Sequence, residues 1–280
     1  MYRNLLVHVP TERPARAAID ASVSLALSCD AHVDAVAAGY EETYSVCPVG
    51  IDASAAAPTI YEADHELAME RANVALNAFS VEAKGAGISF RCRPVTGTFA
   101  EVASMLGPMA RVHGLTVVSQ PESKHGTFDN RIPQELLLRS GGPVLVIPYT
   151  FHGAFCAARV GICWDGSRAA ARALRDAMPF LYQADALTTI SMNESGTVPE
   201  EASQQRLGDY LARVGLPSKA ISLDVDRANI QSAILSLAAD EDLDLLVMGG
   251  YGHSRLQETI LGGVTREMFR SMTVPTLMSH

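Results

Sequence analysis

The sequence has little of several features that would define a class of protein by themselves. Its five cysteines among 280 residues are odd in number, widely spaced and without a CxxC pair. Neither a zinc framework nor a redox-active pair is therefore indicated. No apolar run approaches the roughly 20 residues that span a bilayer, and the first apolar stretch is too short for a signal peptide. These absences predict a cytoplasmic protein with reduced thiols and no membrane association.

An excess of positive charge and recognisable catalytic motifs are lacking as well. The formal net charge of −9 argues against nucleic acid or an anionic membrane as a partner. No P-loop GxxxxGK[ST] is present, and "HELAM", which begins at His65, lacks the second histidine of an HExxH zinc motif. No Ser/His/Asp order or metal-ligand cluster stands out. The sequence therefore predicts neither catalytic residues nor a metal site.

Short apolar runs alternate with helical patterns along the whole chain. In the first half, "NLLVHV" at 4–9 and "LTVVS" at 115–119 have the character of buried strands, and a long helical pattern ends at Gly87. Hydrophobic residues make up 48% of the chain, enough for a substantial core. Strands that alternate with helices in this way predict βαβ units and a parallel sheet.

The second half repeats the plan of the first. "LLLRSGGPVLVIP", which ends at Pro148, corresponds to "EMFRSMTVPTLMS", which ends at Ser279. An internal duplication of about 140 residues follows. It predicts two tandem α/β domains, at 1–150 and 156–280, each with a five-stranded parallel sheet. The alternative is one large sheet of ten strands.

Two loops of the second half carry the residues of a candidate ligand site. Asp165-Gly166-Ser167 directly follows a strand, where a carboxylate can accept hydrogen bonds from a base amine or a ribose hydroxyl. The alternative is a turn with a helix N-cap. The other loop joins a strand to a helix through spaced glycines, whose bare backbone amides can bind an anion. Its alternative is a connection needed for tight packing. This loop contains Met248, Gly249, Gly252, Gly262, Gly263 and Thr265.

The pattern Gly249-x2-Gly252-x9-Gly262, followed by "GVTREM", resembles the nucleotide-binding signature of the universal stress protein family. The aspartate turn after the first strand of this half resembles the family too. The resemblance implies a tandem member with Rossmann-type, adenine-nucleotide-hydrolase-like domains. It further implies ATP or a related adenine nucleotide in the second half, accompanied by Mg²⁺, in a stress response. The implied binding residues are Asp165, Gly166, Ser167, Met248, Gly249, Gly252, Gly262, Gly263, Val264 and Thr265.

The chain also departs from the family pattern. Gly263 stands where ATP-binding members carry serine or threonine. In the first half, Pro10 and Thr11 replace the aspartate turn, and only Gly126 remains of the glycine loop. Nucleotide is therefore expected in the second half alone, with the first half as a structural partner. Family dimers pair through their last strands, so the two halves are expected to form an intramolecular pseudo-dimer. A homodimer of the chain is a further alternative.

Other functions remain open at the level of the sequence. One is an interaction scaffold of the same fold in which neither half binds nucleotide. Another is a slow ATP hydrolase or a nucleotidyl transferase. A loop predicted over 41–58 either covers a pocket or contacts a protein partner.

Overall fold

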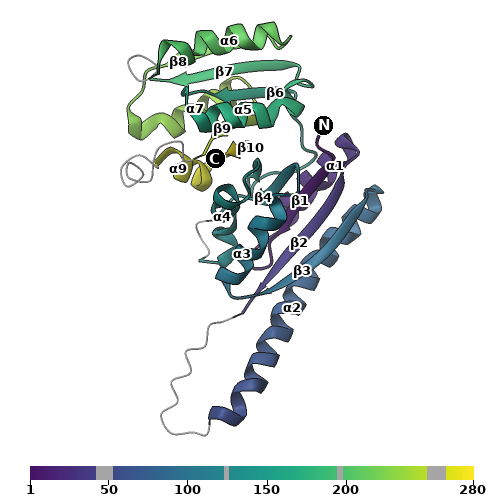
Figure 1. Cartoon of the computed structure of the whole chain (residues 1–280). Coiled ribbons are helices and arrows are strands. Elements are labelled where there is room, and N and C mark those ends of the chain that lie inside the picture. Colours follow the sequence, from purple (N-terminus) through teal and green to yellow (C-terminus); the bar gives the residue numbers. More distant parts are fainter. Residues whose placement is uncertain (42–52, 123–125, 194–197, 251–262) are drawn as a thin grey trace.

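A computed structural model describes residues 1–41, 53–122, 126–193, 198–250 and 263–280, without the side chains of 53–60. The first half contains β1 (Asn4–Val9), α1 (Arg16–Cys29), β2 (His32–Tyr40), α2 (Ala53–Ala86), β3 (Phe90–Gly97), α3 (Phe99–Ala110), β4 (Leu115–Ser119), η1 (Phe128–Asn130), α4 (Ile132–Arg139) and β5 (Val144–Ile147). The second half contains β6 (Arg159–Cys163), α5 (Arg168–Leu181), β7 (Ala186–Met192), η2 (Glu200–Ala202), α6 (Gln204–Arg213), β8 (Lys219–Leu223), η3 (Arg227–Asn229), α7 (Ile230–Asp240), β9 (Leu245–Gly249), α9 (Gly263–Ser271) and β10 (Thr276–Ser279). Figure 1 shows the two halves side by side.

The two halves share one sheet. Its strand order is β3-β2-β1-β4-β5-β10-β9-β6-β7-β8. Within each half the strands are parallel, and the halves meet where β5 and β10 pair antiparallel, with Leu277 opposite Leu145. The α/β architecture with two five-stranded parallel halves is thus confirmed. The ten-stranded alternative describes the same molecule, because the two sheets are joined at their last strands.

The pairing of β5 with β10 has a physical cause in the two sequences. Every residue of "VLVI" in β5 and of "TLMS" in β10 is buried. Such strands cannot stand at an exposed edge, because unpaired backbone groups and apolar side chains would face water. Each strand covers the other, so the chain forms the expected pseudo-dimer internally.

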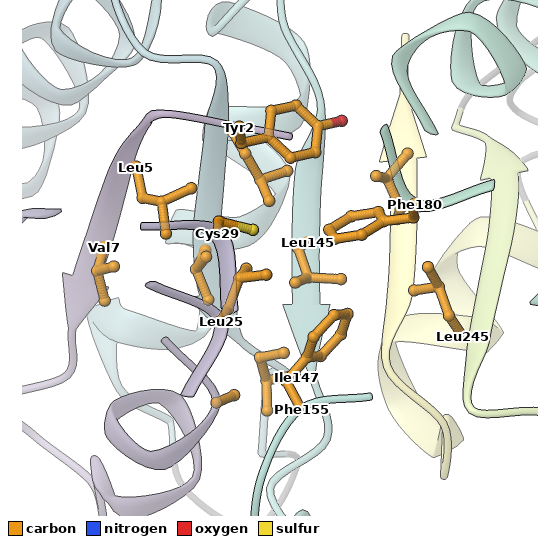
Figure 2. Close-up of a cluster of buried hydrophobic side chains, with 14 of the residues drawn as sticks. Tyr2, Leu5, Val7, Leu25, Cys29, Leu145, Ile147, Phe155, Phe180 and Leu245 are labelled. Carbon is orange, nitrogen blue, oxygen red and sulfur yellow. The ribbon is translucent and has the colours of Figure 1, made fainter. Parts of the chain in front are cut away.

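Helices cover both faces of the sheet. One core cluster gathers residues of α1, α2, α5 and α6, and the other gathers residues of α3, α4, α7 and α9. The first cluster is continuous across the junction of the halves, as Figure 2 shows. There the ring of Phe180 lies 5.3 Å from that of Tyr2 and 5.4 Å from that of Phe155. The hydroxyl of Tyr2 also donates to the backbone carbonyl of Asp176. Aromatic packing and this hydrogen bond therefore hold the halves together.

Helix α2 differs from the sequence-based expectation. It begins at Ala53, so the loop predicted over 41–58 is wrong for its last six residues. The alanines of "ASAAA" explain the difference, because alanine has the highest helix propensity. Residues 42–52 lie outside the described part of the chain. In the described ranges, no helix combines the length and the apolar character that a membrane crossing requires.

Candidate functional site

The candidate site of the second half begins at the turn after β6. The backbone N–H of Ser167 donates to Oδ1 of Asp165 at 2.9 Å, and Gly166 between them has a φ of +70°. The hydroxyl of Ser167 accepts a hydrogen bond from the N–H of Ala170 at 3.1 Å and caps α5. The turn and the N-cap predicted as the alternative are therefore both present. The Asp165 carboxylate is thereby held at the carboxyl end of the sheet.

A neighbouring segment lies against this turn. The indole N–H of Trp164 donates to the carbonyl of Ala202 at 2.7 Å. A Cβ on Gly166 would lie 2.7 Å from Cγ1 of Val198, which a larger residue could not tolerate without a shift. Cys163 precedes Trp164 in the chain. Its pKa is raised to about 12, mainly by burial of the thiol and secondly by the negative charge of Asp165. This thiol stays protonated at neutral pH and is a poor nucleophile.

The first glycine of the candidate loop has a packing role. Gly249 ends β9, and a Cβ there would lie 2.6 Å from the backbone nitrogen of Ala170 and 2.8 Å from the carbonyl carbon of Ala169. The first turn of α5 therefore lies directly against the end of β9. The alternative of tight packing holds for Gly249. The same contact also brings the Asp165 turn and the start of the glycine loop together.

The remaining predicted positions are divided between described and undescribed residues. Gly252 and Gly262 lie outside the described part of the chain. Gly263 opens α9, and a Cβ at Gly263 would meet no neighbouring atom of the described ranges within 4 Å. Val264 is half-buried and Thr265 is buried in the first turn of the same helix. Met248 is buried in the core, which leaves its backbone as the part that can face a ligand.

The equivalent loops of the first half are bonded to each other. These loops follow β1 and β4, the counterparts of β6 and β9 in the strand order. Oδ2 of Asp129 accepts the backbone N–H groups of Thr11 and Glu12, each at 2.8 Å. In return, the Glu12 carboxylate accepts the N–H groups of Phe128 and Asp129 at 2.7 and 3.3 Å. We call this arrangement of Thr11, Glu12, Phe128 and Asp129 the carboxylate clasp.

Buried groups surround the clasp. The Tyr40 hydroxyl donates to Oδ1 of Asp129 at 2.9 Å, and His8 Nε2 lies 3.6 Å from the same oxygen. Burial lowers the pKa of His8 to about 4, so this imidazole is neutral at pH 7. Burial, followed by the Asp129 charge, raises the pKa of Glu12. Two protein carboxylates thus occupy backbone amides that an anionic ligand would otherwise need.

Sequence reasoning did not find the clasp. Its two acids stand 117 residues apart, in loops whose sequences contain no repeated motif. The available signal was Glu12 in the loop after β1, and Glu122 and Asp129 in the segment after β4. In the described ranges, no group of three or more histidine, cysteine, aspartate or glutamate side chains is arranged to hold a metal ion.

The fold and the site define a doubled α/β protein with a loop-built site at the carboxyl ends of the strands of its second half. Residues 158–280 match the model of the universal stress protein family. The second half therefore belongs to the universal stress protein family, and the first half repeats its fold.

Individual relatives agree with this assignment. Universal stress protein Slr1230 of Synechocystis sp. is 27% identical over 138 residues, which cover 48% of this chain and 46% of that protein. The match thus spans about half the length of that relative. A universal stress protein from Archaeoglobus fulgidus DSM 4304 superposes with a TM-score of 0.70 at 16% identity, covering 98% of this chain and 95% of its own. A functionally unknown protein from Pseudomonas aeruginosa PAO1 superposes with a TM-score of 0.62 at 15% identity, covering 99% and 92% of the two chains. These two structures share the fold over both halves.

Proposed function

We propose that the chain is a stress-response protein whose second half binds ATP or a related adenine nucleotide. The observation that supports the proposal is the close contact of Gly249 with the first turn of α5. A Cβ added at Gly249 would lie only 2.6 Å from the backbone nitrogen of Ala170. This contact places the Asp165 turn beside the start of the glycine loop. Nucleotide sites in open parallel sheets lie at such carboxyl ends of strands.

The residues have separate roles in this proposal. Asp165, Gly166 and Ser167 face the base and ribose. The backbone around Met248, Gly249, Gly252 and Gly262 approaches the phosphates. Gly263, Val264 and Thr265 form the first turn of α9, where free N–H groups favour an anion. A phosphate-bound Mg²⁺ would accompany the nucleotide.

The first half has no part in this binding, because its equivalent amides are engaged by the carboxylate clasp. We assign the nucleotide domain to 156–280 and the structural domain to 1–150, which supplies the pseudo-dimer contact through β5. A homodimer would have to use surfaces other than β5 and β10. Native mass spectrometry of the purified protein tests the proposal. Co-purified or added ATP is expected at one molecule per chain, whereas no bound nucleotide would favour an interaction scaffold.

Two substitutions should change ATP affinity in opposite directions. Asp165→Ala removes the carboxylate proposed at the base and ribose and is expected to weaken ATP binding by about tenfold. Gly263→Ser adds the hydroxyl that ATP-binding relatives carry, and among the described residues no neighbouring atom lies within 4 Å of its Cβ. It should strengthen binding by about 1 kcal/mol. Titration calorimetry with ATP measures both.

Asp185→Ala is the matched control, because Asp185 is exposed and precedes β7 at the opposite end of the strands. It should bind ATP as the unmodified chain does. Equal affinities for all three variants would contradict the assignment of the site. Substitution of Gly249 is not a useful test, because a Cβ there disturbs the packing of α5 with or without a ligand.

A further inference from the structure

A groove in the first half lies apart from the nucleotide site. Its volume is about 680 Å³, within the usual range for small-molecule pockets. One wall is the loop between β1 and α1, and the other is helix α2 from Asp64 to Ala78, a length of about 21 Å. The lining residues are Pro10, Thr11, Arg13, Ala15, Asp64, Leu67, Glu70, Arg71, Val74, Ala75 and Ala78.

Arg13 is the buried cation of this groove. It is 8% exposed, and its two terminal nitrogens donate to the backbone carbonyls of Gln120 and Ser119. Its Nε, which is itself buried, has no hydrogen-bond partner in the part of the chain that the structure describes. Among the described residues the guanidinium has no ion-pair partner, and the Asp129 and Glu122 charges act on it from a longer distance. A carboxylate in direct contact with the guanidinium would add the pairing of opposite charges that the two backbone carbonyls do not provide.

The start of α1 also favours a negatively charged ligand in this groove. Its N-cap, Ala15, lines the groove and provides no side-chain hydrogen bond, and the first turn contains no acidic residue. The first N–H groups of a helix are free donors at the positive end of its dipole. The uncapped helix start and the Arg13 side chain therefore stand on the same wall of the groove.

The opposite wall is largely apolar and open to solvent. Leu67 is 57% exposed and Val74 is 63% exposed, and Ala75 and Ala78 continue this surface along α2. Arg71 on this wall already donates to the Tyr40 carbonyl at 2.7 Å. Asp64 and Glu70 also line the groove, and their charges oppose a ligand with several negative groups. A single anionic group on an apolar body fits these walls better than a polyphosphate does.

We propose that this groove binds a small amphipathic monoanion, with its carboxylate at Arg13 and the start of α1 and its hydrocarbon chain along Leu67 and Val74. The site is separate from the nucleotide site of the second half, and its occupant is of a different chemical class.

Octanoate is the probe, and calorimetric titration of the full chain is the measurement. Octanoate should bind, and uncharged octanol should bind at least tenfold more weakly. Val74→Asp should weaken octanoate binding at least tenfold, because it places a like charge on the apolar wall. Val81→Asp is the matched control on the same helix, since Val81 is 68% exposed and does not line the groove. It should leave octanoate binding unchanged.

Arg13→Gln separates the charge from the shape of the groove. This variant should lose the preference for octanoate over octanol, and a melting curve shows whether it is folded. The test on Val74 and Val81 holds whatever the stability of this variant, because both valines are on the surface. Absence of octanoate binding, equal binding of octanol, or equal effects of Val74→Asp and Val81→Asp would each overturn the proposal.

Discussion

Replacement of Asp129 by alanine is expected to lower the free energy of unfolding by about 3–5 kcal/mol. The carboxylate is fully buried and accepts the N–H groups of Thr11 and Glu12 and the hydroxyl of Tyr40. Alanine would leave all three donors in a buried site without an acceptor. It would also remove one of the two carboxylates that join the loops after β1 and β4, and leave the Glu12 carboxylate as the other. Urea denaturation at neutral pH, followed by circular dichroism, measures the loss.

Asp129→Asn is the matched control for this prediction. The amide has the same shape, its oxygen can accept the two backbone N–H groups, and its nitrogen can donate to the Tyr40 hydroxyl. We expect a loss of only about 1 kcal/mol, because the partners are kept while the charge is removed. If asparagine and alanine cost the same, the hydrogen bonds of the carboxylate clasp do not stabilise the first half.

Gly39→Ala is the second substitution with a large expected effect. A Cβ at Gly39 in β2 would lie 2.0 Å from the backbone oxygen of Ala68 and 2.4 Å from its carbonyl carbon. Backbone cannot move aside as a flexible side chain can, so α2 would have to shift away from the sheet. We expect a loss of about 3 kcal/mol or more from this overpacking. Thermal and urea unfolding measure it.

Gly85→Ala provides the comparison within α2 itself. Apart from the backbone of α2 itself, no atom of the described residues lies within 4 Å of a Cβ at Gly85, so the exchange has no steric cost there. Alanine should stabilise the helix by up to about 1 kcal/mol. The opposite signs expected at Gly39 and Gly85 identify the contact between α2 and β2, rather than glycine replacement in general, as the cause. A Gly39→Ala protein as stable as the unmodified chain would contradict the close packing of α2 on β2.

Local patterns in the sequence determined the elements and their duplication. The apolar run at 4–9 forms β1, and Ser167 caps α5, because strand formation and capping depend on residues close together in the chain. The matching ends of the two halves likewise predicted β5 and β10 as equivalent strands. The start of α2 at Ala53 was accessible to the same reasoning, since the alanines that favour it are adjacent in the sequence.

Contacts between distant residues were decided only by the tertiary structure. Hydrogen bonds join the loop of Glu12 to the loop of Asp129, which lie over a hundred positions apart in the chain. No local sequence pattern specifies such a pairing. The sequence alone does not show whether Gly249 is needed for ligand binding or for packing. Its contact with Ala170 depends on how α5 docks on the sheet. The burial of Arg13 likewise depends on contacts with distant residues, because its side chain donates to the carbonyls of Ser119 and Gln120. Periodicity and capping are properties of neighbours along the chain, whereas burial and pairing arise when separate elements come together.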